Sequence, residues 1–442
     1  MAVPVMVAPP DAAPLMAAPS VAAPSWDAWW RHADVLGRYT RDVLCAEMAQ
    51  LRPGGWPWQA RQGDVHLVDD AGADSLELMA LAAAFVERLD LQRDDELAGM
   101  VEQPTWFTWQ ECAKRRLQRD DSVMRFATSG STGRAQSVCH GLASLQQEVD
   151  CIAQRLRSPA KSHAASHAAP ITTAFLVPSN AVSPSIQPHI KIKRVVSVVR
   201  SHHIYGFLFT VLLPMALGRG SAGGNLPLWD AVQGSPAAVR AKLQPGDLVV
   251  AFPDWWALAT RDGMPWPQGI TGVSSTAPCP TSVALAARAA GIDRWIEVYG
   301  STETAGVGWR EDPEAPFELQ PYWERVAVQS PSNGCRGDNT ALRRVPIPVP
   351  ADGSTSTSIS TPNANLSERA AANTADPADP ANPAYPADPV TPGASCHPPD
   401  HLRWVDDRYF WPEGRRDGVV QVAMSLRRAG YGIGTTRWGA IA

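Results

Sequence analysis

Proline recurs every third residue in the run TADPADPANPAYPADPVTP, which lies inside a biased stretch at residues 329–399. Proline lacks a backbone N–H and fixes φ, so such a run blocks helices and sheet ladders alike. Two more stretches are biased: residues 1–25 are mostly alanine and proline, and residues 158–192 include SPAKSHAASHAAP. We therefore predict a disordered Ala/Pro-rich tail at 1–25, a low-complexity insert at 158–192, and an extended insert or linker at 329–399.

Between these stretches, strand and helix patterns alternate. Residues 195–199 and 247–252 are short apolar runs rich in β-branched side chains, residues 281–290 have the pattern of a helix, and residues 295–299 follow as a strand. This β-α-β order with short connections predicts an α/β fold with a mainly parallel sheet covered by helices. Three folded regions are expected: a helical region at 26–118, an α/β core at 121–328, and a short C-terminal region at 400–442.

Composition excludes several classes of protein. The net charge is −5 and the pI is near 6.1, so the chain lacks the electrostatic footprint of a nucleic-acid-binding protein. No apolar run of the sequence reaches the length that spans a bilayer, and no basic residue precedes Arg31, which argues against a secretory signal. The seven cysteines are scattered and lack CxxC spacing, which predicts a reduced, cytoplasmic setting with neither a disulfide framework nor a zinc site.

A loop that alternates hydroxyl residues and glycines lies near the start of the core: Thr128, Ser129, Gly130, Ser131, Thr132 and Gly133. Glycine lets the backbone approach a ligand closely, and successive N–H groups can then point at one anion. The hydroxyl groups add further donors, so the loop suits the β- and γ-phosphates of a nucleotide. The alternative is an ordinary Ser/Gly surface loop.

Three more motifs follow or end predicted strands. Residues 202–207 read HHIYGF, residues 273–278 read VSSTAP, and residues 299–303 read YGSTE. The small side chains of VSSTAP leave the backbone open to contact with a ligand, and a carboxylate such as that of Glu303 can hold Mg²⁺ beside phosphates. Each motif alone also fits a structural role, namely a core histidine pair, a turn between strand and helix, or a strand end with a surface glutamate.

Taken in order, these motifs resemble those of the adenylate-forming enzymes, the superfamily of acyl-CoA synthetases and AMP-ligases. The resemblance covers roughly 121–328 and 400–422, and it implies the large-domain fold of that superfamily, with the small C-terminal domain mostly missing. It also implies a reaction: a carboxylic acid, aryl or fatty, attacks the α-phosphate of ATP, and the thiol of CoA or of an acyl carrier protein captures the acyl-adenylate. ATP and Mg²⁺ are the implied cofactors.

The resemblance also implies the catalytic roles. His203 would gate the carboxylate end of the acyl pocket, and Tyr205 would form one of its walls. Thr302 would donate a hydrogen bond to the α-phosphate, and Glu303 would hold Mg²⁺. The metal and the donors would stabilise the charge that develops on the pentavalent phosphorus, which is where most of the acceleration is expected.

The remaining implied residues bind the nucleotide. The loop 128–133 would hold the phosphates, Ser275 and Ala277 would pack on the adenine, and Tyr299 would stack on it. A last motif lies at residues 400–417, and the resemblance gives a role to three of its residues: Asp400 for the ribose hydroxyls, Arg415 for the nucleotide, and Asp417 as the hinge between the large and small domains. The alternative for this segment is a charged β-hairpin on the surface.

A second resemblance lies in the helical region. Residues 70–76 read DAGADSL, and the apolar positions from Leu76 to Phe85 fall on one helical face that Asp74 or Ser75 can cap. This segment resembles an acyl carrier protein around its phosphopantetheine serine, which implies Ser75 as an attachment point. The alternative is an ordinary helix with an Asp-Ser N-cap.

Two alternatives to the ligase hypothesis therefore stay open. The first is a binding protein derived from a ligase, which keeps nucleotide or acyl binding but has lost catalysis. It rests on Gln136, which stands where the family has a lysine, on the small domain that the resemblance implies to be mostly missing, and on the three biased stretches. The second is a carrier-like interaction module centred on Ser75.

Overall fold

The computed structural model describes residues 28–52, 56, 63–91, 93–119, 122–128, 136–159, 191–219, 224–327, 340–345 and 395–416. From Trp29 onward these residues belong to one compact unit. The predicted tail at 1–25 lies outside the described residues, as does most of both predicted inserts. Within 329–399, two proline-free segments are strands, Thr340–Arg344 and Ser395–Cys396, because their backbones can join a sheet ladder.

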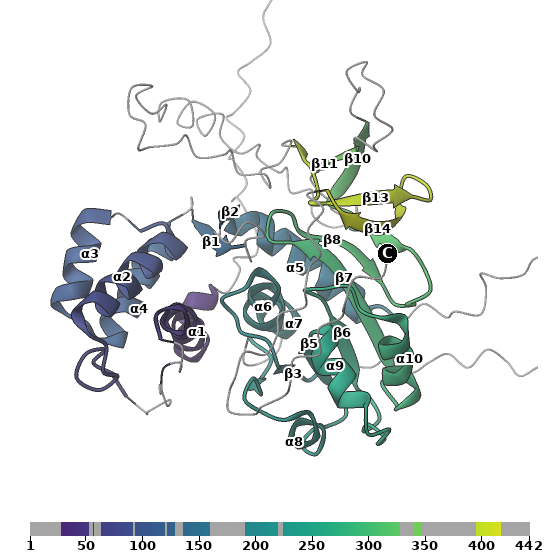
Figure 1. The fold of residues 1–442 in the computed structure, drawn as a ribbon, viewed down its shortest axis with the longest axis horizontal. Helices are drawn as coiled ribbons and strands as arrows, with labels where there is room; N and C mark the ends of the chain where they lie inside the picture. Colours follow the sequence, from purple (N-terminus) through teal and green to yellow (C-terminus); the bar gives the residue numbers. More distant parts are fainter. Residues whose placement is uncertain are drawn as a thin grey trace, which may run out of the picture. The chain divides into compact units, whose positions relative to one another are not determined.

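Helices dominate the N-terminal part of the chain (Figure 1). They are η1 (Trp29–Arg31), α1 (Ala33–Leu51), α2 (Ser75–Leu89), α3 (Arg93–Glu102) and α4 (Trp106–Leu117). The predicted cap of α2 is present as a capping box, in which the Asp74 carboxylate accepts from the N–H of Glu77 and the Glu77 side chain accepts from the N–H of Asp74. The apolar side of α2 buries Leu78, Leu81 and Phe85, whereas Leu76 and Met79, which were predicted on the same face, are exposed.

A nine-stranded sheet, in the order β13-β14-β9-β8-β7-β6-β5-β3-β4, forms the centre of the core. Its strands are β3 (Arg194–Ser197), β4 (Leu228–Asp230), β5 (Asp247–Ala251), β6 (Thr271–Ser274), β7 (Arg294–Ser301), β8 (Ala305–Arg310), β9 (Phe317–Leu319), β13 (Asp400–Trp404) and β14 (Tyr409–Arg415). Strands β4, β3, β5, β6 and β7 are parallel, which confirms the predicted α/β fold. Strands β8, β9, β14 and β13 extend the sheet with antiparallel pairing.

The remaining described strands form two small sheets. One pairs β1 (Val123–Ala127) with β2 (Ser137–Gly141), and the other contains β10 (Trp323–Ala327), β11 (Thr340–Arg344) and β12 (Ser395–Cys396). The hairpin β1–β2 brackets the predicted phosphate loop.

Helices cover the parallel strands. They are α5 (Leu142–Arg157), α6 (Ile204–Phe207), the π-helical segment η3 (Leu208–Leu212), α7 (Leu213–Gly218), α8 (Pro236–Arg240), α9 (Pro253–Thr260) and α10 (Thr281–Ala289). One core cluster joins α8, α9 and α10 to the strands through buried side chains such as Val249, Trp256, Ala287 and Trp295. Figure 1 shows α6 and α7 on the other side of these strands. In the described part of the chain, no helix combines the length and apolar character needed to cross a membrane.

Candidate active site

The YGSTE motif forms the turn between β7 and β8. Gly300 pairs with Gly306 and Ser301 with Ala305, which leaves Thr302 and Glu303 at the tip, both half-buried. The hydroxyls of Ser301 and Thr304 lie 3.0 Å apart and close the turn. A Cβ on Gly300 would overlap the carbonyl oxygen of Ala305, so the motif needs glycine at this position.

The hairpin β13–β14 brings the last motif to the same turn. The Tyr299 hydroxyl donates to Asp400 Oδ2 at 2.8 Å, and Asp400 pairs with Arg415 across the hairpin. Burial, followed by the neighbouring Asp400 carboxylate, raises the pKa of Tyr299 well above its ordinary value, so the phenol stays a donor. Tyr299, Asp400 and Arg415, all expected to bind the nucleotide, are thus brought together, although Tyr299 and Asp400 are 101 positions apart in the sequence.

The VSSTAP motif follows β6. The Ser275 hydroxyl donates to the carbonyl of Val298 at 2.9 Å, which ties the motif to the end of β7. Thr276 adopts a φ of 82°, and Ala277 follows it half-buried. Because β5, β6 and β7 are parallel, their carboxyl ends lie at one edge of the sheet, where open α/β sheets bind ligands.

The HHIYGF motif lies at the same edge: its two histidines follow β3, and its last four residues form α6. The His202 and His203 rings are 4.0 Å apart. Burial, helped by Arg88 and Arg200, lowers the pKa of His203 to about 4, so this imidazole is neutral at neutral pH. The Tyr205 hydroxyl donates to the carbonyl of Ala251 at 3.0 Å and lies 3.3 Å from that of Val273.

The predicted phosphate loop is described only at its base. The N–H of Thr128 donates to the carbonyl of Gln136 at 2.8 Å, and the N–H of Gln136 donates to the Thr128 hydroxyl at 3.0 Å. Residues 129–133 lie outside the described residues, as does Asp417. The Phe126 ring at the end of β1 packs on Phe207 of α6 at 5.5 Å, so the loop's base adjoins the histidine motif.

Two residues next to the Thr302–Glu303 turn belong to none of the sequence motifs. His140 of β2 is fully buried, and its Nε2 lies 2.6 Å from the carbonyl oxygen of Thr302. Glu148 of α5 is also fully buried and accepts from the N–H of Gly306 at 2.9 Å. They hold the two sides of the Thr302–Glu303 turn. Only Glu148 left a sequence signal, as a carboxylate on the apolar face that carries Leu145 and Val149.

We predict that Glu148 makes stability depend on pH. Burial raises the pKa of Glu148 to about 7, so the folded state holds a proton that the unfolded chain releases near pH 4.5. Its stabilising contribution is therefore complete below about pH 4.5 and decreases by about 3 kcal/mol as the pH rises through 7. Urea unfolding of Glu148→Gln between pH 5 and 8 should show a flatter pH profile than the wild type. The control is Glu102→Gln, at an exposed position, which should leave the pH profile of stability unchanged. If the stability of Glu148→Gln changes with pH as steeply as that of the wild type, Glu148 is not the cause of the pH dependence.

The residues at the turn fit a magnesium ion bound together with phosphate. Mg²⁺ in nucleotide enzymes is held by one or two carboxylates, with phosphate oxygens and waters completing the octahedron. Glu303 supplies one carboxylate at the tip of the turn. No group of three or more potential metal ligands occurs among the described residues, so an all-protein metal cage is not formed by that part of the chain.

Comparison with known proteins identifies the family. No family model matches the chain. It is 31% identical over 306 residues to the 4-coumarate–CoA ligase of Rhodobacter capsulatus, covering 68% of this chain and 70% of the relative. It is 28% identical over 407 residues to the 4-coumarate–CoA ligase of Halorhodospira halophila, covering 88% of this chain and 76% of the relative. Among solved structures it is similar to the O-succinylbenzoate–CoA synthetase of Bacillus subtilis, with a TM-score of 0.39, 12% identity, and coverage of 70% and 56%.

The chain belongs to the adenylate-forming superfamily of AMP-forming acyl-CoA synthetases and ligases, which confirms the resemblance drawn from its motifs. It is accordingly an AMP-forming ligase.

Proposed function

We propose that this chain activates an aryl carboxylic acid with ATP and transfers the acyl group to the thiol of CoA. The proposal rests on one observation: the motifs HHIYGF, VSSTAP and YGSTE and the segment that begins at Asp400 meet at one edge of the sheet. There the Tyr299 hydroxyl donates a hydrogen bond to Asp400. The two relatives described above are both 4-coumarate–CoA ligases, so 4-coumarate is the first acid to test.

The proposed reaction, which the family resemblance implies, has two half-reactions. In the first, a carboxylate oxygen of the acid attacks the α-phosphorus of ATP, and pyrophosphate leaves with the bonding electron pair. In the second, the thiol loses its proton to solvent, its sulfur attacks the acyl carbon, and AMP leaves with the electron pair of the acyl–oxygen bond. The neutral His203 would border the acid, and the Thr302 hydroxyl would donate to the α-phosphate. Mg²⁺, when bound at Glu303, would supply positive charge beside the phosphates.

The nucleotide part of the proposal predicts a selective effect at Asp400. Asp400→Asn removes the charge offered to the ribose hydroxyls but leaves an oxygen for the Tyr299 hydroxyl. The KM for ATP should rise about tenfold, because a hydrogen bond to a charged group is weakened, while the KM for the acid changes less than about twofold. Steady-state kinetics measure both constants. Asp407→Asn, at an exposed position in the same hairpin, serves as the matched control. An unchanged KM for ATP in Asp400→Asn would remove Asp400 from the nucleotide site.

The α1–α4 helices favour a second candidate function, a carrier-like module modified at Ser75. Ser75 is exposed at the first position of α2. Its neighbour Leu76 is 80% exposed and Met79 is 45% exposed, so two apolar side chains lie at the surface close to the Ser75 hydroxyl. We infer that this end of α2 could present Ser75 to a phosphopantetheinyl transferase.

Intact-mass measurement tests this second function. After incubation with a phosphopantetheinyl transferase and CoA, the wild type should gain the mass of one phosphopantetheine group, and Ser75→Ala should gain none. Ser158→Ala removes the hydroxyl at the end of α5, where it donates to the carbonyl of Gln154, and should be modified like the wild type. No added mass on the wild type would end the carrier hypothesis and leave the ligase proposal unaffected.

A further inference from the structure

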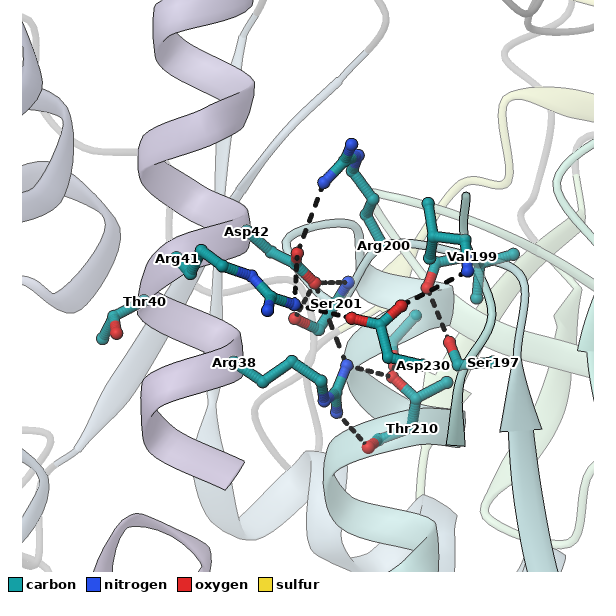
Figure 2. Close-up of polar contacts among 12 residues, drawn as sticks. Arg38, Thr40, Arg41, Asp42, Ser197, Val199, Arg200, Ser201, Thr210 and Asp230 are labelled. Atoms are coloured by element: carbon teal, nitrogen blue, oxygen red, sulfur yellow. Dashed lines mark hydrogen bonds and ion pairs between the residues drawn. The ribbon is translucent and has the colours of Figure 1, made fainter. Parts of the chain in front are cut away.

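Helix α1 lies against the segment that carries the histidine motif (Figure 2). Its residues Arg38 and Asp42 are one turn apart, so both side chains project from the same face. Asp42 reaches the turn after β3, and Arg38 reaches the π-helical segment η3. We call this pair the α1 clamp.

Asp42 holds the turn that precedes the histidines. Its carboxylate accepts from the Ser201 N–H at 2.9 Å and from the Ser201 hydroxyl at 2.7 Å. Asp42 is 1% exposed and Ser201 is fully buried. Strand β3 ends at Ser197, so the amide of Ser201 is not part of the sheet ladder, and a buried amide requires an acceptor. Asp42 supplies that acceptor.

Cations around Asp42 compensate the burial of its charge. Arg200 Nη1 lies 3.5 Å from Asp42 Oδ1, and Arg38 Nη1 lies 3.9 Å from Asp42 Oδ2. Arg41 Nη2 lies 3.7 Å from Asp42 Oδ1 and 2.6 Å from Asp230 Oδ2. Asp42 therefore has charged partners and two hydrogen-bond donors. Moving its buried carboxylate away from them would leave buried polar groups unpaired, which costs free energy, so the carboxylate is held in place.

Arg38 holds the other side of the histidine motif. It donates to the carbonyl and, at 3.2 Å, to the hydroxyl of Thr210. That hydroxyl in turn donates to the carbonyl of Gly206 at 2.7 Å. A π-helical turn leaves carbonyl groups outside the regular α-helical pattern and is often found at functional sites, and Arg38 binds one of them.

The α1 clamp therefore fixes the chain before and after His203. Ser201 lies two positions before His203, and Gly206 and Thr210 follow it within the next two helical turns. A Cβ on Gly206 would overlap the carbonyl oxygen of Arg200, so the segment folds back on itself within this space. A rotation of the Arg200–Ser201 peptide would move His203 directly.

We propose that Asp42 is a positioning residue for the carboxylic acid site, acting through Ser201 on His203. This inference rests on the proposed function, in which His203 borders the acid. We expect the effect of Asp42 to be confined to the acid half of the site, because the described contacts of the α1 clamp do not reach Tyr299, Asp400 or the β7–β8 turn.

Kinetics of the full chain test this proposal. In Asp42→Ala, the KM for the acid should rise about tenfold or more, because the buried Ser201 N–H loses a charged acceptor, while the KM for ATP stays within about twofold. Asp42→Asn keeps an acceptor oxygen, so it should restore most of the acid affinity. Asp230→Asn is the matched control, because it removes a partner of α1 that does not contact the Ser201 turn, and it should leave both constants unchanged.

A readout independent of activity separates this proposal from the proposed function. Hydrogen exchange of the amides at 200–206 should be at least about tenfold faster in Asp42→Ala than in the wild type, with exchange at 299–306 unchanged. If the wild type turns over no acid, the proposed function fails, and the exchange result still decides whether Asp42 holds the turn. Unchanged exchange at 200–206, or equal rises in the KM for acid and for ATP, would overturn the positioning role.

Discussion

Replacing Glu303 with alanine is expected to lower the rate of adenylate formation by at least about 100-fold, because groups that stabilise the transferring phosphoryl group contribute several kcal/mol. Glu303 lies at the tip of the β7–β8 turn, and its side chain forms no hydrogen bond or ion pair with the described part of the chain, so the fold should not depend on it. Single-turnover formation of the acyl-adenylate measures the effect directly. The melting temperature of Glu303→Ala should match that of the wild type.

The matched control is Glu314→Ala, which removes an exposed glutamate in the loop after β8. It should leave adenylate formation unchanged. If Glu303→Ala forms the adenylate at the wild-type rate, Glu303 does not hold the metal and the catalytic assignment of the turn is wrong.

Gly300→Ala is expected to lower the free energy of unfolding by about 3 kcal/mol, because overpacking against backbone forces the chain itself to move. The added Cβ would overlap the Ala305 carbonyl, which belongs to the β7–β8 ladder and cannot rotate away. Urea unfolding measures the loss. Because the Thr302–Glu303 turn would be displaced, adenylate formation should also decrease.

Gly99→Ala provides the comparison within the same chain. Gly99 lies in α3, and a Cβ there meets nothing within 4 Å. Alanine in a helix is more favourable than glycine, so this variant should gain about 0.5–1 kcal/mol. If Gly300→Ala is as stable as the wild type, the described geometry of the turn is incorrect.

The parallel part of the fold could be predicted because each of its elements has a local signal. The strands predicted at residues 247–252 and 295–299 correspond to β5 and β7, and the helix predicted at residues 281–290 corresponds to α10. The antiparallel extension had no such signal. Strands β8 and β9 each pair with the strand just before them in the chain, whereas β14 pairs with β9 from a segment far away in the sequence, and only the resemblance pointed to residues 400–417.

The candidate site also contains some residues that the sequence motifs predicted and others that they did not. The motifs identified Tyr299, Asp400 and Arg415 separately, but their spacing could not reveal that the Tyr299 hydroxyl donates to Asp400. His140 and Asp42 carry no motif at all, since each acts through a backbone group brought close by the tertiary fold. Residues that position a site through the backbone of another segment leave no pattern in a single sequence.

Acid-dependent ATP–pyrophosphate exchange tests the central claim most directly. The full chain would be incubated with ATP, Mg²⁺, labelled pyrophosphate and one acid at a time, beginning with 4-coumarate and continuing through other aryl acids and fatty acids. The account predicts exchange that requires the acid and is lost in Glu303→Ala. If the folded protein shows no exchange with any acid, the ligase proposal is contradicted, and a nucleotide- or acyl-binding protein derived from a ligase becomes the better account.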